Sequence, residues 1–209
     1  MDELPSDALF FTFDGVDGAG KTTQIGLFVD WLRSLGHDVL TCRDPGTTAV
    51  GEKLRAIVLE STDETPISPN SETLIYMAAR AQLVQEIIRP ALAEGKVVVS
   101  DRYLLANVVY QGYGFGLDVD QLWTVGDFAT GRLNPTGTLL LDMDVTAAAA
   151  RRQGKADRME KRDVEYFERL RQGFLTESKR RPQEISVIDA SQSIEKIHQD
   201  IRDAVGPLL

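Results

Sequence analysis

The chain has a single cysteine, Cys42, and this scarcity excludes a framework of intrachain disulfides. One free thiol suits a reducing compartment. No uninterrupted apolar run approaches the roughly 20 residues of a transmembrane helix. The first residues, MDELPSDA, are acidic and carry no apolar stretch of a signal peptide. With only two histidines, no histidine–cysteine nucleophile or metal cluster is indicated. We therefore expect a cytoplasmic protein with no membrane partner.

Basic residues are also in the minority, with 23 lysines and arginines against 32 aspartates and glutamates. The formal net charge of −9 disfavours a broad nucleic-acid surface, so no nucleic-acid partner is expected. In such an acidic chain, basic residues gathered in one place point to a particular anionic ligand. The length of 209 residues fits a single domain, and no repeat or linker-like tract divides it.

Apolar runs and amphipathic segments alternate along the chain, which predicts an α/β fold with a central parallel sheet of about five strands flanked by helices on both faces. Pro90 should kink the longest helix, because proline has no N–H to donate. Residues 102–116, rich in aromatics and glycine, are assigned no element. Strands are expected at 8–13, 37–43, 97–101, 137–144 and 185–189, and helices at 24–35, 50–59, 71–94, 117–130, 164–181 and 193–205, with another starting at 147.

One motif follows directly from the first strand. Residues 15–22, GVDGAGKT, match the phosphate-binding pattern G-x-x-x-x-G-K-[ST]. Its glycines bring N–H groups to an anion, its lysine reaches the β- and γ-phosphates, and its threonine hydroxyl binds Mg²⁺. A glycine-rich turn without a ligand is the alternative, but the flanking strand and helix favour phosphate binding. The expected ATP-binding residues are Gly15, Val16, Asp17, Gly18, Ala19, Gly20, Lys21, Thr22 and Thr23.

Charged residues gather where the strands are expected to end, at the edge of a parallel sheet where ligands bind. Asp44, Asp101 and Asp142 supply the acids. A single arginine there is usually a surface charge or an ion-pair partner, but several beside a phosphate loop indicate a second anionic substrate. The basic residues are Lys21, Arg43, Arg55, Arg80 and Arg102.

Tyr76 and Arg80 are four residues apart, so they share one helix face. An aromatic ring beside a guanidinium can stack on a nucleotide base and donate hydrogen bonds to its edge. Taken alone, Tyr76 is equally well explained by core packing.

Nearly the whole chain resembles the thymidylate kinases, P-loop enzymes that phosphorylate dTMP. The matching stretches are FTFDGVDGAGKTT, RDPGTT, GEKLR, YMAARAQL, SDRY, VVYQG, DRME and IDASQS, in this order. The resemblance implies the P-loop nucleoside monophosphate kinase fold as one domain over residues 1–209. It also implies ATP and dTMP as substrates, Mg²⁺ as the metal ion and a homodimer.

The resemblance implies a role for individual residues at the acceptor site. Arg55 and Arg102 match the arginines that hold the dTMP phosphate, and Asp17 matches the acid that accepts the 3′-hydroxyl. Tyr76 stands where a ring stacks on thymine, and Arg80 where an arginine contacts the base edge. The remaining matches are the base contacts Asn107 and Gln111, Asp44 near the transferred phosphate, and Asp101 as a Mg²⁺-associated or phosphate-adjacent acid.

Within this family the catalytic arginine lies either in the P-loop or in a mobile lid. Gly18 occupies the P-loop position, so a lid at about 150–162 is expected to supply it. Arg151, Arg152 and Arg158 are the candidates, and a solvated basic turn is the alternative. Lys21, Asp44 and Arg102 complete the expected catalytic set.

Two other functions are consistent with a P-loop. A kinase for another nucleoside monophosphate or for a deoxynucleoside would share most of the motifs, although a nucleoside kinase has less need for two acceptor-phosphate arginines. A switch-type nucleotide-binding protein would carry N-K-x-D, which this chain lacks.

Overall fold

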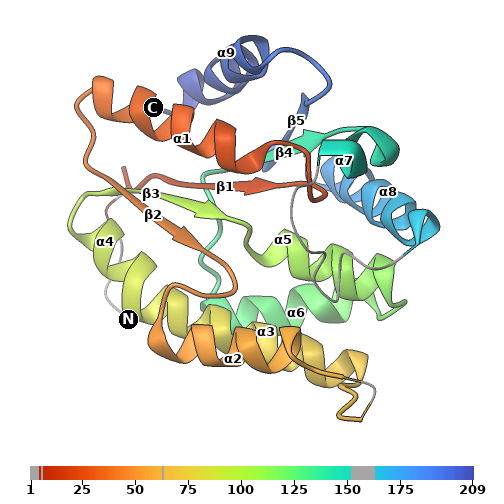
Figure 1. Cartoon of the computed structure of the whole chain (residues 1–209). Coiled ribbons are helices and arrows are strands. Elements are labelled where there is room, and N and C mark those ends of the chain that lie inside the picture. The colour runs from red at the N-terminus through yellow and green to blue at the C-terminus, as the bar shows by residue number, and fades with distance from the viewer. Residues whose placement is uncertain (1–4, 6, 63, 152–162) are drawn as a thin grey trace.

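The computed structural model describes residues 5, 7–62, 64–151 and 163–209. The expected α/β fold is confirmed: within the described residues, five parallel strands form one sheet in the order β2-β3-β1-β4-β5 (Figure 1). The strands are β1 Phe10–Asp14, β2 Val39–Arg43, β3 Val97–Asp101, β4 Gly137–Asp142 and β5 Ile185–Asp189.

Helices cover both faces of the sheet. Figure 1 shows α1 and α9 over one face, and α3, α4 and α6 below the other, with α2 packed beside α3. No helix in the described part of the chain has the length and apolar character needed to cross a membrane. The helices are α1 Lys21–Ser34, α2 Ala49–Leu59, α3 Pro69–Leu83, α4 Arg89–Ala93, α5 Leu104–Asn107, α6 Val119–Thr130, α7 Val145–Arg151, α8 Val164–Arg180 and α9 Ile194–Val205.

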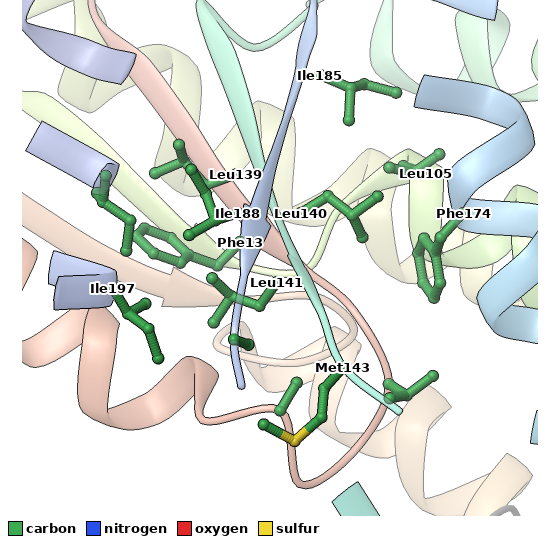
Figure 2. Packing of buried hydrophobic residues seen from close by; sticks show 14 of the residues in the cluster. Phe13, Leu105, Leu139, Leu140, Leu141, Met143, Phe174, Ile185, Ile188 and Ile197 are labelled. Carbon is green, nitrogen blue, oxygen red and sulfur yellow. The ribbon is translucent and has the colours of Figure 1, made fainter. Parts of the chain in front are cut away.

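The central strands alternate their side chains between two hydrophobic layers. In Figure 2, Leu139 and Leu141 lie beside Phe13 and Ile197, on the side of α9. Leu140 points the other way, toward Leu105 of α5 and Phe174 of α8. Strands β1, β3 and β4 are buried on both faces, which suits their largely apolar sequences.

Several expected boundaries are wrong for local reasons. Helix α1 begins at Lys21 rather than at 24, since the left-handed Gly20 leads directly into it. Strand β4 ends at Asp142 rather than 144, because Asp144 accepts hydrogen bonds from the N–H groups of Thr146 and Ala147 and so starts α7. The single helix expected over 71–94 is α3 and α4 joined by a π-helical turn, η1 Val84–Ile88, just before Pro90.

Residues 102–116, which were assigned no element, are largely helical. Helix α5 continues directly into a second π-helical segment, η2 Val108–Gly114. Its glycines serve packing, since a Cβ on Gly112 would lie 2.9 Å from the Val119 side chain, and one on Gly114 would lie 3.0 Å from the Tyr166 ring. The glycines made this segment unlike a typical helix in sequence, but they are what allows it to pack closely against α6 and α8.

Candidate active site

The loop between β1 and α1 has the backbone of a phosphate cradle. Gly15, Gly18 and Gly20 have φ values of 132°, 93° and 94°, which side-chain-bearing residues rarely adopt. A Cβ on Gly15 would also lie 2.4 Å from the carbonyl oxygen of Leu141, so the loop needs glycine there. The first turn of α1 follows at once, and its N–H groups and positive dipole end are suited to an anion.

The P-loop lysine is buried and folded back on its own loop. Lys21 Nζ donates to the carbonyl oxygens of Gly15 at 3.0 Å and Val16 at 3.1 Å, and lies 3.5 Å from Asp17 Oδ1. Burial, together with the charge of Arg102, lowers the pKa of Lys21. A nucleotide phosphate would supply a stronger partner than these neutral carbonyls.

Arg102 lies between the loop and the neighbouring strand. Its guanidinium donates to Gly15 O at 3.1 Å and to Asp17 Oδ1 at 2.5 Å, and its backbone has a φ of 69°. Tyr110 of η2 donates to Asp17 Oδ2 at 3.3 Å, and its ring lies under the guanidinium. Burial alone would raise the pKa of Asp17, but the charges of Arg102 and Lys21 overcome burial and lower it. Tyr110 was not predicted, although it lies in the stretch VVYQG.

A chain of buried polar groups lies beside a cavity of about 240 Å³, which is also lined by Tyr76. Arg80 donates to Asp44 Oδ2 at 2.5 Å and to Asn107 Oδ1 at 3.0 Å. Asn107 donates to Gln111 Oε1 at 2.6 Å, and Gln111 donates to Glu72 Oε1 at 3.0 Å. An arginine only donates and a carboxylate only accepts, so the two ends of this chain fix the orientation of both amides. Glu72 was not predicted, because nothing in its local sequence indicates its distant partner.

The predicted base contacts therefore come together, but mostly beneath the surface. Arg80 is 2% exposed, Asn107 3% and Gln111 not at all, whereas Tyr76 lines the same cavity and is half-buried. Burial raises the pKa of Asp44 despite its ion pair with Arg80.

The predicted phosphate ligands lie where two cavities meet. The larger cavity, of about 750 Å³, is formed by P-loop residues 17–24 together with Arg151 and Gln192–Ile194. It shares four lining residues with the cavity beside Tyr76, namely Asp17, Asp44, Arg55 and Arg102. A ligand in each cavity would thus meet at a wall with two arginines and two acids.

The other predicted residues differ in whether they line either cavity. Asp142 does not join the site, because both of its oxygens pair with Arg171 of α8 and it lines neither cavity. Arg43 reaches the rim of the larger cavity but is paired with Glu52 at 2.8 Å on the surface. Arg151 lines that cavity and donates to Ala190 O at 3.2 Å. Arg152 and Arg158, with most of the lid predicted at 150–162, lie outside the described residues.

The residues predicted to bind Mg²⁺, Thr22 and Asp101, both line the larger cavity. Asp101 Oδ1 is buried and accepts no hydrogen bond from the described residues, so it has a free lone pair for an ion or its bound water. Among the described residues there is no group of three or more His, Cys, Asp or Glu side chains that could hold a metal. Thr22 and Asp101 are nevertheless oxygen donors of the kind that Mg²⁺ takes.

Comparisons with known proteins identify the family of the chain. A family model described as thymidylate kinase matches residues 13–201. The thymidylate kinase of Kosmotoga olearia is 42% identical over 195 residues, covering 92% of this chain and 93% of that protein. The thymidylate kinase of Rhodopirellula baltica is 44% identical over 197 residues, covering 94% of this chain and 80% of that protein.

The fold has a solved counterpart. The crystal structure of thymidylate kinase from Ehrlichia chaffeensis superposes with a TM-score of 0.79 at 27% sequence identity, covering 95% of this chain and 98% of that one. Family model, relatives and fold agree over nearly the whole chain, so it belongs to the thymidylate kinases, the P-loop kinases that phosphorylate dTMP to dTDP.

Proposed function

We propose that this chain transfers the γ-phosphoryl group of ATP to dTMP, with ATP in the P-loop cavity and dTMP in the cavity beside Tyr76. The observation that carries this proposal is the wall that the two cavities share, with Arg55 and Arg102 at the junction. Direct in-line transfer needs the two nucleotides to meet end to end. Two adjacent anion sites with a common wall provide that arrangement.

On the donor side, the P-loop N–H groups and Lys21 hold the ATP phosphates. When ATP binds, Lys21 exchanges the carbonyls of Gly15 and Val16 for charged phosphate oxygens. This stronger interaction offsets the free-energy cost of burying the lysine. Thr22 and Asp101 would hold Mg²⁺, which would neutralise charge on the phosphates. Arg151 also lines this cavity, which supports the prediction that residues 150–162 supply catalytic arginines.

On the acceptor side, Arg55 and Arg102 hold the dTMP phosphate and Asp17 accepts the 3′-hydroxyl. Arg55 donates to Pro45 O at 3.0 Å, which fixes it beside Asp44 at the shared wall. With the phosphate held there, a phosphate oxygen of dTMP attacks the γ-phosphorus of ATP as the bond to ADP breaks. Asp44 lies next to the reacting groups, where its charge can orient Arg55 and Arg80.

Base selection is assigned to Arg80, with Asn107 and Gln111 behind it and Tyr76 stacking on the ring. Arg80 has five N–H groups, and its partners are Asp44, Asn107, Met77 Sδ and Tyr103 O. One N–H therefore remains for the O4 oxygen of thymine. Cytosine has an amino group at that place, which can only donate.

Two further expectations belong to the same proposal. The lone Cys42 is buried, in keeping with a cytoplasmic protein. A homodimer is supported by exposed apolar side chains on neighbouring helices, Ile57 of α2, Leu74 of α3 and Phe128 of α6, which are 52%, 60% and 90% exposed. Light scattering on the wild type and Phe128→Asp would test it, since a dimer formed there should dissociate in the variant.

The reaction is tested by incubating the protein with ATP, Mg²⁺ and each nucleoside monophosphate or thymidine in turn, and identifying products by chromatography. We expect dTDP and ADP in equal amounts, much slower turnover of dCMP and of thymidine, and loss of activity with EDTA that excess Mg²⁺ restores. Preferred turnover of thymidine or of another monophosphate would overturn the assignment of dTMP.

A further inference from the structure

Asp14, the last residue of β1, has a place in the site that no assigned role explains. Its side chain is completely buried, and neither carboxylate oxygen accepts a hydrogen bond from any described residue. The charged groups that face it are Lys21 from α1, Arg102 and Asp101 at the end of β3, and Asp44 after β2. Among the described residues, the cationic atom nearest to it is Arg102 Nη1, 3.9 Å from Asp14 Oδ1.

A carboxylate in this position cannot be explained by its contribution to folding. Burying a charged group without hydrogen bonds is unfavourable. Accordingly, burial raises the pKa of Asp14 to about 7, even though Arg102 and Lys21 favour its charged form. Asp142, at the end of the neighbouring strand β4, instead has both oxygens paired with Arg171 at 2.8 and 2.9 Å. A strand-end aspartate can therefore be well satisfied in this fold, and Asp14 is not.

The position of Arg102 suggests what Asp14 does. Arg102 is bound to Asp17 and Gly15, and its backbone is held at a positive φ beside the P-loop. If Asp17 accepts the 3′-hydroxyl of dTMP and Arg102 binds the phosphate, as proposed above, the contact between these two side chains must loosen. During this exchange, after the guanidinium leaves Asp17 and before it pairs with the phosphate, Asp14 is a carboxylate that stays close to it.

We propose that Asp14 is a positioning residue: its ionised carboxylate keeps the Arg102 guanidinium at the wall shared by the two cavities while Arg102 exchanges Asp17 for the acceptor phosphate. This inference rests on the proposed function of Arg102. It accounts for an acid buried without hydrogen bonds, 3.9 Å from the arginine at the shared wall.

The test compares Asp14→Asn with the matched variant Asp142→Asn at the neighbouring strand end. Asp14→Asn should raise the KM for dTMP by about tenfold or more, with a smaller effect on the KM for ATP, because Arg102 is the nearest cation. The same variant should unfold about 3 °C or more above the wild type at pH 8, because it removes a buried charge. Asp142→Asn should keep both KM values and unfold at a slightly lower temperature.

Weaker dTMP binding in a more stable protein is a combination that a purely structural role would not produce. An unchanged KM for dTMP, an equal rise in the KM for ATP, or a variant less stable than the wild type at pH 8 would each overturn the inference. Arg102→Ala separates the two proposals. If Arg102→Ala loses dTMP affinity and Asp14→Asn does not, only the role of Asp14 is wrong. If Arg102→Ala, like Asp14→Asn, keeps the wild-type KM for dTMP, the role of Arg102 is wrong as well.

Discussion

Replacing Arg80 with methionine tests the electrostatics of the acceptor cavity most directly. Methionine has a similar length but no charge, so the change removes the buried partner of Asp44 without leaving a large void. Asp44 is then a fully buried carboxylate whose pKa burial already raises. We therefore expect Arg80→Met to destabilise the protein strongly at pH 8, because it strands a charge.

The size of the effect follows from the geometry of the pair. The Nε–Oδ2 distance is 2.5 Å, and the side chains are 2% and 0% exposed, so solvent screens neither charge. Breaking such a pair by removing one partner costs about 3–5 kcal/mol. At about 2–4 °C per kcal/mol for a chain of this size, the melting temperature should fall by roughly 10 °C.

The direction of the pKa shift of Asp44 predicts how the stability loss in Arg80→Met changes with pH. A folded-state pKa above the ordinary value of 3.8 means that the protonated carboxyl is favoured in the folded protein, so its contribution to stability is lost as pH rises. Without Arg80, which lowers this pKa, the dependence must steepen. The deficit of Arg80→Met relative to the wild type should therefore be smaller at pH 5 than at pH 8.

These expectations are tested by measuring the free energy of unfolding with urea at pH 5 and pH 8. Four proteins are compared: the wild type, Arg80→Met, Asp44→Asn and the double variant. The double variant should be more stable than Arg80→Met at pH 8, because asparagine leaves no stranded charge. If Arg80→Met matches the wild type at pH 8, or if adding Asp44→Asn lowers stability further, the pair is not held as described.

The remaining predictions concern activity. Lys21→Ala should fold normally by circular dichroism and yet lose almost all turnover, and near-normal turnover of dTMP would contradict its assignment. Replacing Arg151, Arg152 and Arg158 together by alanine should lower kcat by more than it raises the KM for dTMP, toward the roughly 10³–10⁵ attributed to such arginines; a normal kcat would refute the lid. Tyr76→Ala should weaken dTMP and dCMP equally, whereas Arg80→Met, assayed below its melting temperature, should lower the preference for dTMP by at least about tenfold; equal losses on both nucleotides would show that Arg80 does not select the base.

The sheet and the P-loop could be predicted because their signals are local. Doubly buried strands are apolar along their length, and the loop needs glycines at fixed spacing. The π-helical segments could not, because the extra residue in each turn depends on what packs against it. In η2, for example, the two glycines lie against Val119 of α6 and Tyr166 of α8, which come later in the chain.

The sequence also could not predict which distant side chains pair with one another. Spacing placed Tyr76 and Arg80 on one helix face, but not the partner of Arg80, which is 36 residues earlier in the chain. Position at a strand end predicted the same environment for Asp101 and Asp142. Only the packing of α8 against the sheet brings Arg171 to Asp142 and takes it out of the site.

The continuous helix from Leu104 through Gly114 has a consequence for which changes this chain can tolerate. Its first part turns Asn107 and Gln111 toward Glu72, while its last residues, Tyr113 and Gly114, lie against α8. Inserting or deleting one residue would rotate one end relative to the other and break one of these two sets of contacts. A change of length within this helix should therefore be more damaging than the same change in the loops on either side.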